Sequence, residues 1–347
     1  MEQQDILSMT LPELQAAVQE LGEPKFRAKQ IFNWLHQKRV TDFSEMTTLS
    51  LPFRERLASD FCINRLKIAK RLASSVDDTV KYLYELPDGN YVETVCMQYH
   101  HGTSLCISTQ VGCRMGCRFC ASAIAGFVRN LTPAEMLLQI YETERAQNCS
   151  PSGHCLEAGI QLVYFVYLQG HVLRFLQLLS DPNGYGMSLR HVTVSTCGVV
   201  PKILELAEQR LGLTLSVSLH CPNDAGRSAI MPINRSYPID VLLDACQTYF
   251  EKTGRRVTFE YAVMDQVNSA EQDAAALAER LKGLHAHVNL IPINPVKERN
   301  FHTLKKTVLQ FQKTLERYGI PATIRRTLGS DIEAACGQLR RDAIQQT

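Results

Sequence analysis

The chain has 347 residues, of which 45% are hydrophobic and 21% are charged. This balance is that of an ordinary globular protein and excludes a disordered tail, a collagen-like fibre and a simple coiled coil. The length predicts roughly two domains. Lys and Arg number 37 against 35 Asp and Glu, a net charge of +2. A nucleic-acid partner would therefore have to contact local basic patches rather than a uniformly basic surface.

The cysteine count and the apolar runs indicate the compartment. Twelve cysteines are more than average, but far fewer than a disulfide scaffold of this length would have. The first five residues are polar and acidic, unlike a secretory signal, and no apolar run approaches the roughly 18 residues that span a bilayer. We therefore expect a cytoplasmic protein without a membrane partner, in which clustered cysteines serve metal or redox chemistry.

The first predicted elements are helices, within a small helical domain over residues 1–65. Thr10-Leu-Pro-Glu13 has the pattern of a capping box with proline near the helix start. An apolar stripe at helical spacing follows, formed by Ala28, Ile31, Phe32 and Leu35. The lysines and arginines around this stripe are typical of a solvated helix face or of a small RNA-contacting domain.

Residues 66–98 are predicted to form a β-hairpin extension. Val80, Tyr82 and Tyr84 alternate with other residues, as in a half-buried strand. The turn Asp88-Gly-Asn90 follows, and the strand pattern resumes from Tyr91 to Met97.

Over residues 99–347, strand-like and helix-like segments alternate. Thr132 begins a second capping box, Pro201 opens another helix, and Gly254 follows a helix predicted over Ile239–Thr253. The strand candidates are Ser104–Ser108, Leu162–Leu168, His191–Ser195, Leu213–Leu219, Arg256–Val263 and His287–Ile291. This alternation predicts βα units around a parallel sheet. Six such strands favour an α/β fold with an open, partial (β/α)6 barrel.

The strongest local signal is the run Cys113-Arg-Met-Gly-Cys117-Arg-Phe-Cys120. Structural zinc needs four ligands, usually from two Cys-x-x-Cys pairs, and the sequence has no second pair. Three thiolates instead suit three irons of a cubane, with the fourth iron left open. We therefore expect a [4Fe-4S] cluster on these three cysteines, with zinc or an inert cysteine loop as the alternatives.

A Cys-x3-Cys-x2-Cys run followed by βα units resembles the signature of radical S-adenosylmethionine enzymes. In that superfamily the open iron binds the amino and carboxylate groups of S-adenosyl-L-methionine. An electron from the cluster then cleaves the sulfonium and produces a 5′-deoxyadenosyl radical. The cofactor performs the difficult step and the protein directs the radical.

The flanking segments resemble the RlmN/Cfr family of RNA adenine methyltransferases. The matching segments are Ser104–Cys113, Gly126–Thr132, His191–Pro201, Ser218–Asp224 and Gly329–Leu339. The run from Phe26 to Leu57 also resembles the accessory domain of this family. The match is nearest the dual-specificity branch, which methylates C2 of one adenosine in 23S rRNA and of one beside the tRNA anticodon. It implies 23S rRNA and tRNA as partners, an electron donor such as flavodoxin or ferredoxin, and a monomer.

The resemblance also implies a two-stage transfer, because C2 of adenine is electrophilic and an ordinary methyl transfer to it fails. One S-adenosylmethionine methylates a thiol that matches Cys336. A second supplies the radical that removes a hydrogen from this methyl group, and the resulting carbon radical adds to the ring. Glu93 matches the base that removes the ring proton. Cys106 matches the thiol that releases the product by forming a transient disulfide with Cys336.

Cofactor contacts carried over from the family are Ser195, Ser218, Leu219, His220 and Asn294. Each lies at or near the carboxyl end of a candidate strand, where barrel sites form. A polar side chain at such a position can instead cap the following helix.

One segment departs from the family pattern. The family has a Gly-Glu-Pro motif at the end of the second barrel strand, where this chain reads Gly159-Ile-Gln-Leu-Val-Tyr-Phe-Val-Tyr-Leu-Gln-Gly170. The segment 147–171 is either genuinely altered or a local reading-frame error. A catalytically impaired RNA-binding iron–sulfur protein is therefore one alternative to the C2 enzyme. A C8-methylating relative, which shares the motifs above, is another.

Overall fold

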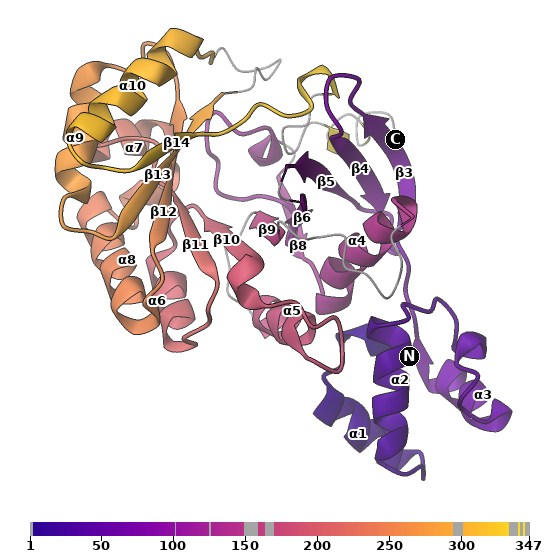
Figure 1. Cartoon of the computed structure of the whole chain (residues 1–347). Helices are drawn as coiled ribbons and strands as arrows, with labels where there is room; N and C mark the ends of the chain where they lie inside the picture. The colour runs from indigo at the N-terminus through magenta and orange to yellow at the C-terminus, as the bar shows by residue number, and fades with distance from the viewer. Residues whose placement is uncertain are drawn as a thin grey trace.

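The structure is a computed structural model that describes residues 3–100, 102–124, 126–148, 159–163, 170–293, 301–332, 339, 340 and 343. One large sheet has helices along its outer side, and a helical N-terminal region lies beside it (Figure 1). Within the described residues, no helix is long and apolar enough to cross a membrane.

Ten of the described strands form one sheet in the order β14-β13-β12-β11-β10-β9-β6-β5-β4-β3. Seven neighbouring strands are parallel. They are β6 (Gly102–Ser108), β9 (Gly159–Val163), β10 (Val192–Thr196), β11 (Thr214–Ser218), β12 (Val257–Val263), β13 (Ala286–Pro292) and β14 (Ala322–Ile324). Three antiparallel strands continue the sheet beyond β6: β5 (Tyr91–Tyr99), β4 (Val80–Glu85) and β3 (Lys67–Ala73).

The predicted α/β fold with an open barrel is confirmed, with two corrections. The seventh parallel strand, β14, was not predicted because its three residues are too few for an alternating pattern. The strand predicted over Leu162–Leu168 begins at Gly159 instead, and its described part ends at Val163. The remainder of the predicted span, from residue 164, lies outside the described residues.

The predicted hairpin is confirmed, since β4 and β5 pair antiparallel across the turn at Asp88. The third strand, β3, was missed. Its residues are Lys-Ile-Ala-Lys-Arg-Leu-Ala and all but one are exposed, so it lacks an apolar face. Charged residues are typical of edge strands, where they discourage pairing with other chains.

Helices cover the outer side of the parallel strands, as Figure 1 shows for α6, α8 and α9. Strand side chains alternate between two faces. Leu215 and Val217 of β11 are fully buried on the helix side, while Ser216 and Ser218 lie on the inner side. The described α-helices after residue 130 are α4 (Pro133–Ala146), α5 (Gly170–Ser180), α6 (Val200–Glu208), α7 (Asp224–Ile230), α8 (Ile239–Thr253), α9 (Glu271–Leu281) and α10 (Lys305–Arg317).

The N-terminal region contains α1 (Leu11–Glu20), α2 (Phe26–His36) and α3 (Leu51–Asp60). The predicted stripe of α2 is confirmed, since all four of its apolar residues are fully buried. His36 at the end of α2 and Tyr141 of α4 share a hydrogen bond of 2.9 Å. Arg39 forms a 2.9 Å ion pair with Glu144 of α4. These buried contacts fix the N-terminal helices to the sheet-bearing part of the chain.

Short elements complete the described fold. β1 (Gln4–Asp5) pairs with β2 (Phe61–Cys62), and β7 (Gln110–Gly112) pairs with β8 (Phe127–Asn130). The 3-10 turns are η1 (Ile6–Ser8), η2 (Phe43–Glu45), η3 (Ala121–Ala123), η4 (Leu189–His191), η5 (Pro232–Arg235) and η6 (Ser330–Ile332).

Candidate active site

The three cysteines of the Cys-x3-Cys-x2-Cys run lie in the loop between β7 and β8. The ends of this loop meet where the Cys113 N–H donates to the Gly126 carbonyl oxygen at 3.1 Å. A Cβ atom on Gly112 would lie 1.7 Å from that oxygen, and Gly112 has φ of +75°. Glycine is therefore required at this position by both the close approach and the backbone conformation.

All three thiols line a single cavity of about 120 Å³. The carboxyl ends of β10 and β11 also contribute to the lining of this cavity. The sequence-predicted residues in the lining are Cys113, Cys117, Cys120, Ser195, Ser218 and His220. The structure thus brings the predicted cluster ligands together with three of the predicted cofactor contacts.

The donor set fits an iron–sulfur cubane. Among the described residues, no three His, Cys, Asp or Glu side chains gather closely enough to hold one metal ion. In a cubane each thiolate binds a different iron, so thiols spread around one cavity are suitable. Burial raises the pKa of the Cys113 and Cys117 thiols. Loading the cluster must therefore displace their protons, since the thiolate is the ligand.

His220 contributes a neutral imidazole to the cavity wall. Burial lowers its pKa to about 3. The Ala262 N–H donates to its Nδ1 at 2.9 Å, and its ring packs edge-on against Phe119 with centroids 4.8 Å apart. The backbone φ of His220 is 58°, in the left-handed region that non-glycine residues seldom adopt. Such backbone strain is commonly found at functional sites.

Arg227 of α7 holds the strand ends behind this wall. Its guanidinium is fully buried and donates to the carbonyl oxygens of Cys197 at 2.8 Å and of Ser218 and Leu219 at 3.1 Å. Cys197 itself lines the cavity, although it lies outside the Cys-x3-Cys-x2-Cys run. Leu219 has its side chain in the apolar core, so only its main chain is available to a ligand.

Two polar residues of the inner face were missed by sequence analysis. Gln161 of β9 donates from Nε2 to Ser195 Oγ at 3.2 Å and to Glu260 Oε1 at 3.5 Å. Ser218 Oγ donates to Glu260 Oε2 at 3.1 Å. Glu260 is 7% exposed and lines the same cavity as the three cysteines. The available signal was Gln161 as the one polar side chain of β9 and Glu260 as the one charged side chain of β12.

Glu93 lies on the inner face of β5 in a buried ion pair. Its Oε2 is 3.0 Å from Lys81 Nζ of β4, and the exposed fractions of the two residues are 7% and 0%. Cys106 of β6 is the register partner of Val95, two residues beyond Glu93. Side chains at i and i+2 of a strand share a face, so Cys106 and Glu93 lie on the same side of the sheet.

The C-terminal segment, here residues 325–332, crosses from β14 towards β4 and β5, as the yellow ribbon in Figure 1 shows. Leu328 packs against an apolar cluster that contains Cys106 and Val95. Asp331 accepts hydrogen bonds from Ser74 Oγ at 2.6 Å and from the Ser75 N–H at 2.7 Å. These contacts hold the segment beside the face that carries Cys106.

Beyond residues 333–338, the chain contacts the same face again. The backbone N–H of Arg340 donates to Glu93 Oε1 at 2.8 Å. The described residues that precede and follow Cys336 in the sequence thus contact the Cys106 cluster and the Glu93 carboxylate, while Cys336 itself lies outside the described residues.

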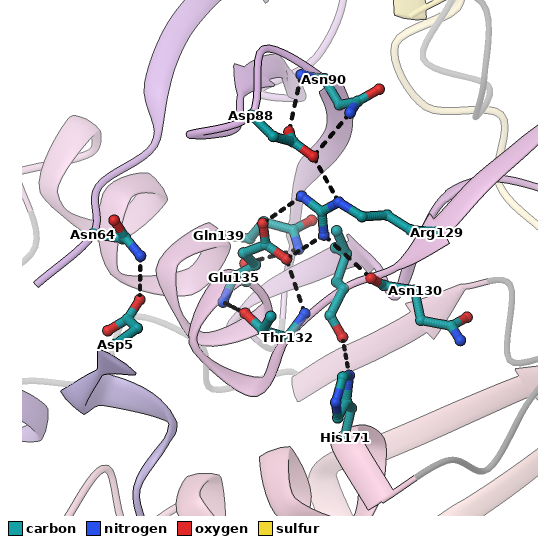
Figure 2. Close-up of polar contacts among 11 residues, drawn as sticks. Asp5, Asn64, Asp88, Asn90, Arg129, Asn130, Thr132, Glu135, Gln139 and His171 are labelled. Carbon is teal, nitrogen blue, oxygen red and sulfur yellow. Dashed lines mark hydrogen bonds and ion pairs between the residues drawn. The ribbon is translucent and has the colours of Figure 1, made fainter. Parts of the chain in front are cut away.

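Hydrogen bonds of Arg129 join the turn between β4 and β5 to β8 and α4, which follow the cysteine loop (Figure 2). Arg129 of β8 donates to Asp88 Oδ2 through Nε and to Glu135 Oε1 through a terminal nitrogen, both at 2.7 Å. The predicted capping box of α4 is confirmed, since the Thr132 N–H donates to Glu135 Oε2 at 2.9 Å. Arg129 thus ties β4–β5, which carry Lys81 and Glu93, to the frame of the cysteine loop.

Two predicted site residues, Asn294 and Cys336, lie outside the described residues. The expected disulfide is not supported by the described part of the chain, in which no two of the nine cysteines are joined in one.

Comparisons with known proteins agree with this architecture. Residues 4–63 match the family described as ribosomal RNA large subunit methyltransferase N-terminal domain, and residues 107–278 match the radical SAM superfamily. A probable dual-specificity RNA methyltransferase RlmN from Lachnoclostridium phytofermentans is 47% identical, over 99% of this chain and 96% of that protein. Its namesake from Alkaliphilus oremlandii is 46% identical over 99% and 100%.

A solved structure is also similar. The crystal structure of a radical SAM methyltransferase from Sphaerobacter thermophilus superimposes with a TM-score of 0.90. The two chains are 39% identical, and the match covers 96% of this chain and 98% of the other.

Proposed function

The chain belongs to the RlmN family of radical S-adenosylmethionine RNA methyltransferases, and we propose that it methylates C2 of one adenosine in 23S rRNA and of one beside the tRNA anticodon. The family implies a [4Fe-4S] cluster and S-adenosyl-L-methionine as cofactors. When bound, the cluster supplies the electron that cleaves S-adenosylmethionine reductively.

In this proposal, Cys113, Cys117 and Cys120 hold the cluster. Ser195, Ser218, His220, the main chain of Leu219 and Asn294 bind S-adenosylmethionine. The cavity shared by the three thiols with Ser195, Ser218 and His220 supports this assignment.

The observation that carries the function is the position of the C-terminal segment. Leu328 packs on the Cys106 cluster before Cys336, and the Arg340 N–H binds the Glu93 carboxylate after it. A methyl carrier, a base and a resolving thiol must meet for this chemistry. The contacts of Leu328 and Arg340, which precede and follow Cys336 in the sequence, support such a meeting. Glu93 and Cys336 are nevertheless 243 positions apart in the sequence.

The roles of the three residues follow in order. The Cys336 thiolate accepts a methyl group from one S-adenosylmethionine. After the 5′-deoxyadenosyl radical has taken a hydrogen atom from that group, its carbon bonds to C2 of the adenine and leaves a radical on the ring. The ring regains its aromaticity by losing one electron, which the oxidised cluster would accept, and the C2 proton, which the Glu93 carboxylate accepts. The Cys106 thiolate then attacks the Cys336 sulfur and breaks the bond from sulfur to the methylene carbon. That carbon takes up a proton, so that the products are the methylated base and a transient disulfide.

Binding of RNA is assigned to the small N-terminal domain over residues 1–65. The hairpin extension over 66–98 carries the base Glu93, and the radical chemistry is assigned to residues 99–347. The target adenine must leave its stack to reach a recessed site. Phosphate contacts by lysines and arginines would make binding weaken as salt increases. A cytoplasmic monomer reduced by flavodoxin or ferredoxin completes the proposal.

The test is expression of the chain in a bacterial strain whose own C2 methyltransferase gene is deleted. Mass spectrometry of digested 23S rRNA and tRNA should find 2-methyladenosine in both. 8-Methyladenosine would instead identify the C8 branch. Absence of either base, with the cluster loaded, would identify a catalytically impaired protein and would contradict the proposal.

A further inference from the structure

Glu260 is a buried carboxylate in the wall of the cysteine cavity. It lies on the inner face of β12, is 7% exposed, and shares the cavity lining with Cys117, Ser195 and Ser218. Its backbone is fixed in the middle of the parallel sheet, where Ser218 and Asn289 are its register partners on the two neighbouring strands. The two neighbouring strands, β11 and β13, therefore fix the position of Glu260 in the wall of the cavity.

No described residue places an opposite charge on Glu260. Its hydrogen bonds come from two neutral donors, Ser218 Oγ at 3.1 Å and Gln161 Nε2 at 3.5 Å. His220 is neutral, because burial lowers its pKa to about 3. Arg227 directs its hydrogen bonds to carbonyl oxygens and to Asn234.

A buried carboxylate without a cation is costly, because its desolvation is not offset by an opposite charge. The arrangement is stable when a ligand in the cavity brings that charge. S-Adenosylmethionine carries a permanent positive charge on its sulfonium, whereas its amino group is neutral once it binds the open iron. The two hydrogen bonds hold the carboxylate in place before the ligand arrives, which reduces the ordering required on binding.

We propose that Glu260 binds a positively charged group of S-adenosylmethionine in this chain. The proposal rests on the proposed function in taking S-adenosylmethionine as the ligand of the cavity. It assigns to β12 a contact that the sequence analysis did not place there.

The test is the affinity of the cluster-loaded protein for three ligands, measured by anaerobic equilibrium dialysis. S-Adenosylmethionine has the sulfonium charge, S-adenosylhomocysteine lacks it but keeps the amino group, and methylthioadenosine lacks both. Glu260→Gln should weaken S-adenosylmethionine binding at least tenfold and methylthioadenosine binding less than twofold. An unchanged affinity for S-adenosylhomocysteine assigns the contact to the sulfonium, and an equal loss for S-adenosylhomocysteine would contradict a contact with the charged group.

Glu142→Gln is the matched control, since Glu142 is 6% exposed in α4 and pairs with Arg65. It should leave all three affinities unchanged. Unchanged S-adenosylmethionine binding by Glu260→Gln, or an equal loss of methylthioadenosine, would overturn the proposal. Unfolding of Glu260→Gln would also overturn it, because the amide preserves the shape and the protein itself would then need the charge. A parent protein that binds no S-adenosylmethionine would reject the proposed function, a distinct result.

Discussion

Cys117 and Cys221 are both buried thiols of one apolar cluster, yet only Cys117 belongs to the Cys-x3-Cys-x2-Cys run. Cys117→Ser should remove a thiolate ligand, and the iron content after anaerobic purification should fall from about four per chain to below one. Cys221→Ser should keep the iron of the parent. Equal iron in both variants would show that this thiol is not a cluster ligand.

The buried pair of Lys81 and Glu93 leads to a stability prediction. Removing one partner of a buried ion pair costs ~3–5 kcal/mol, because the remaining charge stays desolvated. Lys81→Met should therefore lower the free energy of unfolding by ~3 kcal/mol in a urea titration. The double variant Lys81→Met, Glu93→Gln should recover part of this loss. A double variant whose loss equals the sum of the two single losses would show that the pair is not coupled in solution.

Local motifs made some site residues predictable, whereas others depend on the three-dimensional fold. The cysteine run is contiguous, and its spacing alone indicated a metal centre. Gln161 and Glu260 are 99 positions apart. Gln161 is the one polar side chain of β9 and Glu260 the one charged side chain of β12. Only the folding of the sheet brings the two within hydrogen-bonding distance. The ion pair of Lys81 with Glu93 likewise depends on the register between β4 and β5.

At the scale of elements, the C-terminal segment is anchored by Asp331. Hydrogen bonds from Ser74 and Ser75 lower the pKa of this exposed carboxyl to about 2, so it stays ionised at neutral pH. Asp331→Ala should release the segment and reduce methylation of Cys336 in cells at least fivefold, without changing the melting temperature. Asp331→Asn retains one acceptor oxygen and should have an intermediate effect. Peptide mass spectrometry measures the methylated fraction, and parental methylation in Asp331→Ala would contradict the tether.

Element boundaries were predictable where end signals are strong. The helix predicted over Ile239–Thr253 matches α8 at both ends, because Gly254 adopts a left-handed φ of 65° that ends the helix. The strand β14 has no comparable signal. It is short and lies at the sheet edge, so its pairing with β13 rather than its own sequence defines it.

For the whole molecule, His36 links folding to pH. Burial lowers its pKa from 6.5 to about 4, so the unfolded chain binds the proton first as pH falls. Above about pH 7 the His36 imidazole is neutral in both the folded and the unfolded chain, so protonation of this group costs no stability there. Stability is lost as pH falls from about 6.5 towards 4, by up to ~3 kcal/mol for this group.

Urea unfolding at pH 7.5 and pH 5 checks this linkage. The parent should be less stable at pH 5, and His36→Gln, which has no titrating ring, should show a smaller difference between the two pH values. An identical difference in the two proteins would show that the buried contact of His36 with Tyr141 does not control the acid response.

The central claim is that Cys336 carries the transferred carbon beside Glu93 and Cys106. The direct measurement uses the Cys106→Ala protein, loaded with its cluster and incubated with labelled RNA. A denaturing gel, followed by mass spectrometry of the digested adduct, identifies the linkage. The account predicts an RNA adduct in which a methylene joins adenine C2 to the Cys336 sulfur, because the resolving thiol is absent. Normal turnover by Cys106→Ala without a shifted band would contradict it.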